Sequence, residues 1–376
     1  MISPEVFYNL LSRCGIDFFS GVPDSLLKSF CAYITDHSPA NHHIIAANEG
    51  GAIGLAAGYH LATGKIPAVY MQNSGMGNAA NPLISLMDKD VYQIPVLLII
   101  GWRGEPGQHD EPQHVKQGKI TIPLLDAMQI RHEILTNNPT ELNPQLDRVY
   151  SSLVTTSEPF ALIVKKGTFE PYTLAKNVSS GWTLPREQAL QLLTSRLGKD
   201  DLIVSTTGMI SRELFEFREQ CEEGHAHDFL TVGSMGHANQ IALGISLFKP
   251  DRRVFCFDGD GALLMHLGSL GIAGALATSN FYHIVFNNSA HDSVGGQPTV
   301  GSSVDFPTIA KACGYRTALS VQTEEELVKV IERIDTLEAP LFLEIKVAKG
   351  ARKNLGRPTT TPIQNKNDLM KLLSTR

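Results

Sequence analysis

The sequence predicts an α/β protein built from two doubly wound parallel-sheet domains, with no domain between them. Short apolar segments of strand length alternate with helical segments through both halves of the chain, and this alternation is typical of parallel sheets. The chain of 376 residues is also long enough for two domains of ordinary size, each with its own hydrophobic core.

The first half of the chain carries this alternation from its start. A capping hydroxyl, a proline and an acid at residues 3–5 are typical of a helix start. Strands are expected at 17–20, 44–47, 68–72, 95–100 and 160–165. Before the last of these strands, residues 101–119 form a polar segment that we interpret as a functional loop because of its length.

The domain boundary is expected at residues 169–184, where periodicity is lost and Gly, Pro and Ser are frequent. This linker would separate a first domain of residues 1–168 from a second of residues 185–376. Helices of the second domain are expected from 185, at 305–315 and at 321–334. Its strands are expected at 202–205, from 230, and at 254–257, 282–286 and 340–347.

The most informative stretch is the βαβ unit of residues 254–297. Its first strand ends in the sequence DGDG at residues 258–261, and its second strand ends in Asn287 and Asn288. Because the carboxyl ends of parallel strands meet at one edge of a sheet, Asp260 and the asparagine pair should be neighbours. Carboxylate and amide oxygens are ligands that Mg²⁺ prefers, and glycines beside the acid let a phosphate approach the backbone. The expected site is Mg²⁺ with a diphosphate.

Two other interpretations of this turn were weighed. An EF-hand calcium loop would need a third oxygen ligand where Ala262 stands and a glutamate where Ser269 stands, so it is set aside. A purely structural turn stays open, although an aspartate followed by paired asparagines is an unusual choice for packing alone.

Composition argues against nucleic acid and membranes as binding partners. The formal net charge is −6, so no general attraction to nucleic acid or to an anionic membrane is expected. The N-terminus lacks the basic and apolar regions of a signal peptide, and no apolar run reaches the length of a membrane span. Five scattered cysteines favour reduced thiols. We therefore expect a cytoplasmic protein that acts on a small molecule.

The sequence GDG at residues 259–261, followed after one helix and one strand by Asn287 and Asn288, resembles the cofactor fingerprint of thiamin-diphosphate enzymes. The resemblance implies thiamin diphosphate and Mg²⁺ as cofactors. Asp260, the side chain of Asn288 and the backbone carbonyl of Ala290 would be the metal ligands. Gly259 and Gly261 would contact the cofactor.

Glu49 is the most informative acid of the first domain. It stands between an expected strand and the glycine- and alanine-rich segment 50–58. A carboxylate in that place is most often a helix cap, but the small residues favour the close approach of a flat ligand. By the same resemblance, Glu49 would hydrogen-bond the aminopyrimidine N1′ of the cofactor beside the turn that contains Ser74 and Gly75. Asp24 would be an active-site acid.

The remaining expected site residues follow from the same resemblance or from their chemistry. Met235 would be the bulky residue that bends the cofactor. Further cofactor contacts are expected from Gly208, Met209, Gly233 and Ser234. Candidates for proton transfer are Asp24, His109, His237 and His291. Candidates for binding an anionic substrate are Arg103, Lys116, Arg352, Lys353 and Arg357, with His237 in addition.

Many members of this family carry a middle domain, for which the linker leaves no room. A fused two-domain chain of this length resembles the phosphonopyruvate and sulfopyruvate decarboxylases, and the runs 287–299 and 354–358 resemble the phosphonopyruvate enzymes most closely. The resemblance implies decarboxylation of 3-phosphonopyruvate to phosphonoacetaldehyde and CO2, a step towards 2-aminoethylphosphonate, in a homodimer or higher homo-oligomer with shared active sites. Sulfopyruvate decarboxylation, carboligation of pyruvate or another 2-oxo acid, and a catalytically silent α/β binding module are the alternatives.

Overall fold

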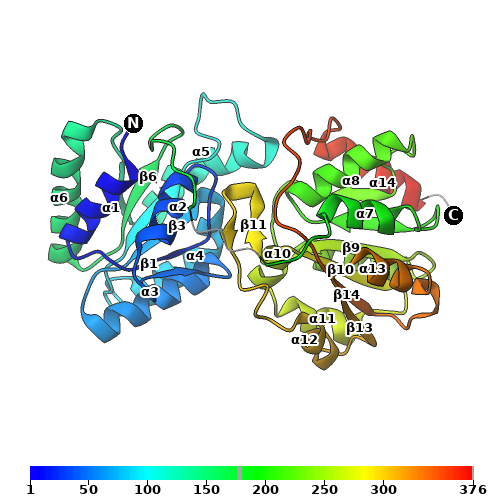
Figure 1. Ribbon diagram of the computed structural model, residues 1–376. Helices are drawn as coiled ribbons and strands as arrows, with labels where there is room; N and C mark the ends of the chain where they lie inside the picture. The colour runs from blue at the N-terminus through cyan, green and yellow to red at the C-terminus, as the bar shows by residue number, and fades with distance from the viewer. Residues whose placement is uncertain (176–179, 375–376) are drawn as a thin grey trace. The chain divides into compact units, whose positions relative to one another are not determined.

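The computed structural model describes residues 1–175 and 180–374. These residues form two compact units, one of residues 1–175 with 294–297 and one of residues 180–293 with 298–374. Each unit contains a six-stranded sheet whose strands pair in parallel. The predicted α/β class with two parallel-sheet domains is therefore confirmed (Figure 1).

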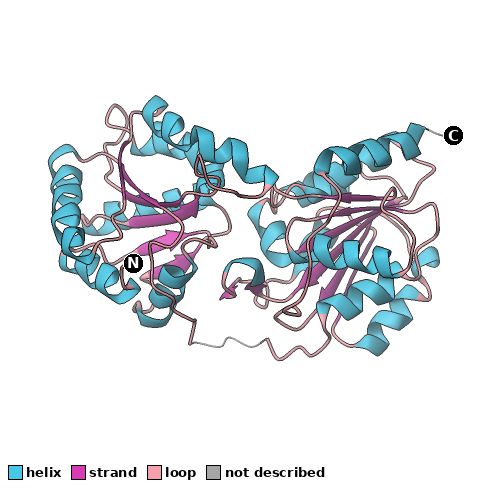
Figure 2. Ribbon diagram, turned by 90° about the horizontal axis from the view of Figure 1, so that it is seen from above, coloured by secondary structure: helices cyan, strands magenta, loops and turns pink. Residues whose placement is uncertain are grey.

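The first unit has helices on both faces of its sheet. In spatial order, its strands are β2 (His43–Ile45), β1 (Phe19–Gly21), β3 (Ala68–Gln72), β4 (Leu97–Gly101), β6 (Phe160–Val164) and β5 (Arg131–Ile134). Its α-helices are α1 (Pro4–Arg13), α2 (Lys28–His37), α3 (Glu49–Thr63), α4 (Met76–Pro82), α5 (Pro112–Ala127) and α6 (Pro139–Thr156). Figure 2 shows the strands between the helical layers.

Two separate hydrophobic clusters fill the space on either side of this sheet. Tyr70 of β3 packs into the cluster under α1, α2 and α6, whereas its neighbours Val69 and Met71 pack into the cluster under α3, α4 and α5. Side chains alternate between the two faces along a strand. A strand that is buried on both faces therefore needs a continuous apolar run, which is the pattern that made these strands predictable.

The second unit repeats this design. In spatial order, its strands are β13 (Thr317–Val321), β14 (Leu341–Lys346), β10 (Phe281–Asn287), β9 (Val254–Gly259), β7 (Leu202–Ser205) and β8 (Asp228–Leu230). One cluster packs under α7 (Arg186–Thr194), α8 (Met209–Gln220) and α13 (Glu324–Ile331). The opposite cluster packs under α9 (Ala238–Phe248), α10 (Asp260–Met265), α11 (Ser269–Leu276), α12 (Phe306–Ala312) and α14 (Pro362–Ser374).

Several local predictions are wrong. The strand expected from residue 230 ends there, because β8 spans Asp228–Leu230. The segment 101–119 is a loop only in its first part, because α5 begins at Pro112, where a proline suits the first helical turn. The helix expected between β9 and β10 is two helices, which end at Met265 and begin again at Ser269. The helix expected at 321–334 begins only at Glu324, and Val321 ends the preceding strand β13.

Four strands were also not predicted. Two are the short strands β11 (Ala290–His291) and β12 (Gln297–Pro298), which pair with each other. The others, β5 and β13, are edge strands of the large sheets, and most of their residues are half-buried or exposed. A strand in that environment does not need a continuous apolar run, so it leaves a weaker signal in the sequence.

The domain boundary proposed at 169–184 stays a prediction, and residues 176–179 of it lie outside the described residues. All five cysteines are free thiols in the structure. Of the helices in the described ranges, none combines the length and the apolar character that a bilayer span requires.

Candidate functional site

The predicted site residues gather where the strands end. In the first unit, the residues that follow β1, β2, β3 and β4 include Asp24, Glu49, Gly75 and Arg103, respectively. In the second unit, the residues that follow β7, β8, β9 and β10 include Gly208, Ser234, Asp260 and Asn288. Ligands bind at this edge of open parallel sheets. Each unit therefore carries its own candidate site.

Glu49 is the first residue of α3 and is only 5% exposed. The cap of that helix is Asn48, whose Oδ1 accepts the N–H of Gly51 at 2.8 Å. Capping therefore does not account for Glu49. Its Oε2 accepts a hydrogen bond of 2.7 Å from Nδ2 of Asn78, and this neutral amide leaves the carboxylate free of a strong ion pair.

Gly75 lies directly against the Glu49 carboxylate. A Cβ at position 75 would be 2.3 Å from Oε1 of Glu49. The backbone of Gly75 has φ −70° and ψ −14°, which any residue can adopt. Glycine is therefore needed at position 75 because a side chain would collide with the Glu49 carboxylate, and not because the backbone conformation requires it. Ser74 beside it is exposed and donates to Oε1 of Gln72 at 2.8 Å.

Asp24 is completely buried at the end of β1. Its Oδ1 accepts from Nε2 of Gln72 at 2.7 Å, and its Oδ2 accepts from the N–H of Leu26 at 2.9 Å. Burial raises the pKa of this carboxyl above its ordinary value, against the lowering effect of the Gln72 amide. A Cβ at Gly101 would be 2.1 Å from Oδ2. A carboxyl group with a raised pKa is suited to proton transfer.

The segment after β4 holds Arg103 in a fixed position. Its Nε donates to Oδ2 of Asp110 at 2.8 Å, its second terminal nitrogen pairs with Oδ1 of the same residue, and its first donates to Oγ of Ser25 at 2.8 Å. Its backbone carbonyl accepts from Nδ2 of Asn73 at 2.8 Å. Arg103 could thus reach an anion only in competition with Asp110.

The other predicted residues of this segment are spread over two elements. His109 is exposed in the loop, and Lys116 is exposed on α5. His114 is 9% exposed on the same helix. The loop and the helix therefore divide residues that the sequence had suggested as one group.

Asp260 begins α10 and is 2% exposed. In the sheet register, Gly259 pairs with Phe286, so Asp260 lies beside the start of the asparagine pair. The N–H of Asn288 donates to the Asp260 carboxylate. The predicted proximity of these residues is confirmed. The hydroxyl of Thr299 also donates to Oδ2 of Asp260.

Burial raises the pKa of Asp260 to about 7, although Thr299 and backbone N–H groups lower it. Within the described ranges, no Lys or Arg is among the largest contributions to this pKa, and none forms an ion pair with Asp260. A buried carboxylate without a cationic neighbour fits a divalent cation, whose charge favours the ionised form. Oδ1 of Asn288 and the carbonyl of Ala290 add two hard oxygen donors, so the residues present fit Mg²⁺.

The backbone that carries these oxygens is held by its own side chains. Ser289 has φ 56°, a left-handed conformation that is uncommon for a residue with a Cβ. Its N–H donates to Oδ1 of Asn287 at 3.0 Å, and the N–H of Ala290 donates to Oδ1 of Asn288 at 3.0 Å. Nδ2 of Asn287 in turn donates to Oε1 of the buried Glu344 at 2.7 Å. The first asparagine therefore supports the loop.

His291 and Met235 meet at Gly261, next to Asp260. A Cβ at Gly261 would be 3.0 Å from Cε1 of His291 and 3.4 Å from Cε of Met235. Burial lowers the pKa of His291 to about 4, and nearby Asp292 only partly offsets this. His291 is therefore a neutral imidazole at pH 7 and only a weak base.

Three other predicted groups lie elsewhere in the second unit. His237 is exposed, and its ring centroid is 4.5 Å from that of His266. Gly208 has φ 104° and precedes Met209, the first residue of α8. Gly233 is half-buried in the segment that follows β8.

The basic segment near the C-terminus is partly paired with acids. Nε of Arg352 donates to Oε1 of Glu187 at 2.9 Å, and its terminal nitrogen pairs with Glu216. Lys353 and Arg357 are exposed in the same segment. The charge of Arg352 is thus already compensated, and the substrate roles of these residues stay predictions.

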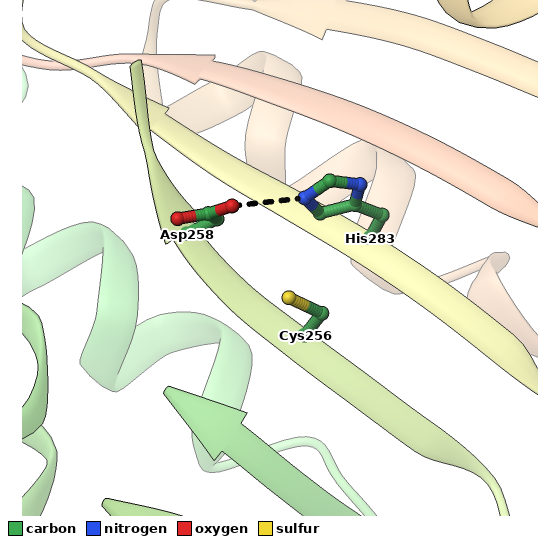
Figure 3. A group of neighbouring side chains, drawn as sticks. All are labelled: Cys256, Asp258 and His283. Atoms are coloured by element: carbon green, nitrogen blue, oxygen red, sulfur yellow. Dashed lines mark ion pairs between the residues drawn. The ribbon is translucent and has the colours of Figure 1, made fainter. Parts of the chain in front are cut away.

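A second polar cluster lies in the sheet behind the DGDG turn (Figure 3). Cys256 pairs with His283 in the register of β9 and β10, and Asp258 follows two residues later on the same face. Nε2 of His283 lies 3.4 Å from Oδ2 of Asp258, and donor atoms of all three residues lie within 4.8 Å of one another. A structural zinc site has four ligands, and the described ranges offer three here. Asp258 also accepts the N–H of Gly259 at 2.9 Å, which favours a role in shaping the turn.

The structure also contains a pocket of about 830 Å³ in the first unit, and none of the predicted site residues lines it. Among its lining residues, Lys165 pairs with Glu105 at 2.5 Å. Arg148 lines it too and pairs with Glu133 at 3.3 Å. Because these two cationic side chains are already paired with acids, they do not indicate which ligand the pocket would bind.

Several residues that support the sites were not predicted. They are Gln72, Asn78, Asn287 and Thr299, and each contacts a predicted acid or the loop beside it. All four stand within or beside stretches that the sequence already emphasised, the turn of Ser74 and Gly75 and the run 287–299, so polar residues in these stretches were the available signal. Their particular partners could not be read from those motifs.

Comparison with known proteins gives matches in both units. Residues 3–130 match the family model described as the N-terminal TPP binding domain of thiamine pyrophosphate enzymes, and residues 206–345 match the model of their C-terminal TPP binding domain. The chain is 34% identical over 369 residues to the phosphonopyruvate decarboxylase of Streptomyces viridochromogenes, which covers 94% of this chain and 90% of that protein.

Two further relatives match over similar lengths. The phosphonopyruvate decarboxylase of Streptomyces hygroscopicus is 32% identical over 377 residues, with 96% of this chain and 92% of that protein covered. The sulfopyruvate decarboxylase of Methanosarcina acetivorans is 26% identical over 374 residues, with 93% and 92% covered. In all three cases the similarity runs through both units.

Proposed function

The chain belongs to the thiamine pyrophosphate enzymes, and on this basis we propose that it decarboxylates 3-phosphonopyruvate to phosphonoacetaldehyde and CO2. The observation that carries the proposal is the 34% identity to a phosphonopyruvate decarboxylase over 94% of the chain. Thiamin diphosphate is the cofactor, and Mg²⁺ is the metal that the oxygen donors around Asp260 fit. The product would serve the synthesis of 2-aminoethylphosphonate.

Each unit contributes a different part of the chemistry. Thiamin diphosphate supplies a nucleophilic carbon and an electron sink for the pair left behind by CO2. Asp260, Asn288 and Ala290 would hold the metal that binds the diphosphate. Glu49 would hydrogen-bond the aminopyrimidine ring, and Gly75 leaves room for its carboxylate.

Proton transfer needs groups that can hold or accept a proton near neutral pH. Burial raises the pKa of the Asp24 carboxyl, which brings it closer to that range. Burial lowers the pKa of the His291 imidazole to about 4, so His291 is neutral at pH 7 and would act as a hydrogen-bond partner more readily than as a base. His109 and His237 are exposed and remain further candidates.

The phosphonate would be bound by cationic groups. Arg103 and Arg352 are each paired with acids, whereas the exposed Lys116 and Lys353 take part in none of the ion pairs found in the described ranges. We therefore rank these two lysines first among the substrate-binding candidates. A phosphonate dianion carries one more negative charge than a sulfonate, so an unpaired lysine favours the phosphonate.

The test is CO2 release from phosphonopyruvate, sulfopyruvate and pyruvate, each with and without thiamin diphosphate and Mg²⁺. We expect cofactor-dependent release with kcat/KM for phosphonopyruvate at least about 10²-fold above that for pyruvate, because buried polar groups reject a substrate that leaves them unpaired. Asp260→Ala is the matched inactive control.

Other outcomes would replace the proposal by a defined alternative. Faster release from sulfopyruvate would assign the chain to the sulfonate reaction, which the 26% identical Methanosarcina relative makes the second candidate. Formation of a longer 2-hydroxy ketone from pyruvate would indicate a carboligase. Absence of turnover and of cofactor binding would leave a silent α/β module.

We further propose a homodimer or higher homo-oligomer with shared active sites in the cytoplasm. Five free cysteines fit a reducing compartment. Sedimentation equilibrium at working concentration should give at least twice the 41.0 kDa mass of one chain. Full activity of a species with the mass of one chain would contradict the shared-site proposal.

A further inference from the structure

We propose that Asp292, Arg186 and Glu213 form a positioning network that fixes the side-chain amide of Asn288 for metal binding. The inference rests on the proposed function, because it assigns to Asn288 a role in holding the divalent cation. All four residues lie in the second unit, so the argument needs only the structure of that unit.

The network begins at the Asn288 side chain. Nδ2 of Asn288 donates to Oδ2 of Asp292 at 2.6 Å. An amide has its oxygen opposite its NH2 group, so this bond decides which way Oδ1 points. Oδ1 is the atom that would bind the metal, and in the structure it accepts the N–H of Ala290 at 3.0 Å.

Asp292 is in turn held by two further donors. Oδ2 accepts from the N–H of Gly350 at 2.9 Å and from a terminal nitrogen of Arg186 at 3.1 Å. Three donors on one oxygen leave the carboxylate little freedom to rotate. The hydrogen bond to Asn288 therefore has a defined direction.

Arg186 is the fixed point of the network. Its side chain is 5% exposed, and it donates to both carboxylate oxygens of Glu213, from Nε at 2.9 Å and from a terminal nitrogen at 2.8 Å. The side chain of Glu213 is 2% exposed. A buried guanidinium held along one edge by both oxygens of a carboxylate is rigid. Its remaining edge points at Asp292.

The three residues of the network come from different elements of the second unit. Arg186 is the first residue of α7 and Glu213 lies on α8, whereas Asp292 lies in the loop after β10. The ion pairs therefore tie the loop of the metal ligands to two helices that pack on the sheet. Groups that orient metal ligands in this way typically change metal affinity about 10- to 100-fold when they are removed.

Two variants break the network at different points and either keep the Arg186–Glu213 pair or remove it as a whole. Asp292→Ala removes the acceptor of Asn288 and keeps the Arg186–Glu213 pair. The double variant Arg186→Met/Glu213→Leu removes both buried charges together, an exchange that proteins often tolerate. The matched control is Arg218→Met/Asp228→Leu, because that pair is also buried in the second unit but contacts no residue of the loop.

The measurement is the dissociation constant of Mn²⁺, a spectroscopic substitute for Mg²⁺, in the presence of saturating thiamin diphosphate. Free Mn²⁺ is counted by electron paramagnetic resonance, so the readout does not depend on turnover. Asp292→Ala should raise this constant about 10- to 100-fold, the Arg186/Glu213 double variant should raise it about 10-fold, and the Arg218/Asp228 control should leave it unchanged. The melting temperature of each metal-free variant separates lost stability from lost metal affinity.

The outcomes distinguish this inference from the proposed function. Wild-type protein that binds no Mn²⁺ with thiamin diphosphate would overturn the proposed cofactor site itself. Wild-type protein that binds Mn²⁺, together with variants whose affinity equals the wild-type value, would overturn only the positioning network. An equal weakening in the control pair would also overturn it, because the effect would then be one of general stability.

Discussion

The candidate sites of the two units hold their polar groups in opposite ways. In the first unit, Glu49 and Asp24 accept hydrogen bonds from the neutral amides of Asn78 and Gln72. In the second unit, the loop of the metal ligands is tied to its helices through the buried ion pair of Arg186. The two acids of the first site are thus held by neutral donors, whereas the loop of the second site is anchored through charges.

The two arrangements differ in what it costs to change them. A neutral hydrogen bond contributes about 1 kcal/mol net, whereas removing one partner of a buried ion pair costs about 3–5 kcal/mol. Acids held by amides can therefore exchange a partner or a proton during a reaction cycle. Ligands held by ion pairs stay in place. We infer that the first site is built for proton handling and the second for holding a cation.

The largest effect should come from Glu49→Gln. The glutamine keeps the shape of the side chain but cannot accept a proton, so kcat should fall about 10²- to 10⁴-fold with little change in cofactor affinity. The matched control is Glu5→Gln, because Glu5 is exposed on α1. Steady-state kinetics at saturating cofactor check the result. A kcat within threefold of wild type would contradict the proton-handling role.

The next effect should come from Asp260→Asn. Loss of the carboxylate should weaken metal binding at least about 100-fold, since residues that merely orient ligands already contribute about 10- to 100-fold. The metal-free variant should be as stable as wild type or more so, because a buried carboxylate without a cationic neighbour is removed. Calorimetric metal titration and thermal melting test both parts. Lower stability of the metal-free variant would show that the carboxylate has a structural role.

A smaller effect is expected from Gly75→Ala. Its new Cβ would lie 2.3 Å from the Glu49 carboxylate, and such overpacking costs about 1–3 kcal/mol of stability. Gly77→Ala is a suitable control, because Gly77 lies only two residues away and its Cβ would meet no atom within 4 Å. The control should gain about 0.5–1 kcal/mol from helix propensity. Equal changes in the two variants, measured by chemical denaturation, would remove the argument that the carboxylate requires glycine.

The smallest expected effect is a difference in how stability depends on pH. Burial raises the folded-state pKa of Asp24 above the unfolded value, so folded protein binds this proton more tightly. The free energy of unfolding should therefore fall as pH rises from about 4 through that raised pKa. Asp24→Asn should abolish this fall. Denaturation at a series of pH values measures it.

Asp17 provides a control of opposite sign. Burial tends to raise its pKa, but hydrogen bonds from Tyr59 and Lys65 lower it on balance. Its stabilisation should be present above about pH 4 and lost as pH falls through the depressed pKa. Since Asp17 is partly exposed, Asp17→Asn should cost less than about 1 kcal/mol. The same pH dependence in both variants would contradict the assignment of the two shifts.

The sequence predicted the interior strands of both six-stranded sheets but missed one edge strand in each, β5 and β13. Interior strands such as Leu97–Gly101 are buried on both faces and therefore need continuous apolar runs. Edge strands such as Arg131–Ile134 are half-exposed, so their residues resemble a loop. Helix breaks were missed where the sequence kept its apolar character, as between Met265 and Ser269.

The site was predictable where neighbours in space follow from neighbours in topology. Asp260 and Asn288 follow adjacent parallel strands, so their proximity is a consequence of the fold. Arg186 and Asp292 are 106 positions apart and meet only through the packing of a helix against a loop. A charged residue carries no local sign of which of the many opposite charges it will meet. Such networks are therefore visible only in the structure.

The left-handed backbone of Ser289 between the proposed metal ligands has a consequence for mutational tolerance. A β-branched side chain is strongly disfavoured at φ 56°, whereas glycine and asparagine adopt this region readily. Saturation mutagenesis of this codon under selection for activity should therefore retain Gly and Asn and deplete Val, Ile and Thr. The backbone angle φ would then determine which amino acids are tolerated at position 289, although the side chain of Ser289 is not one of the proposed metal ligands.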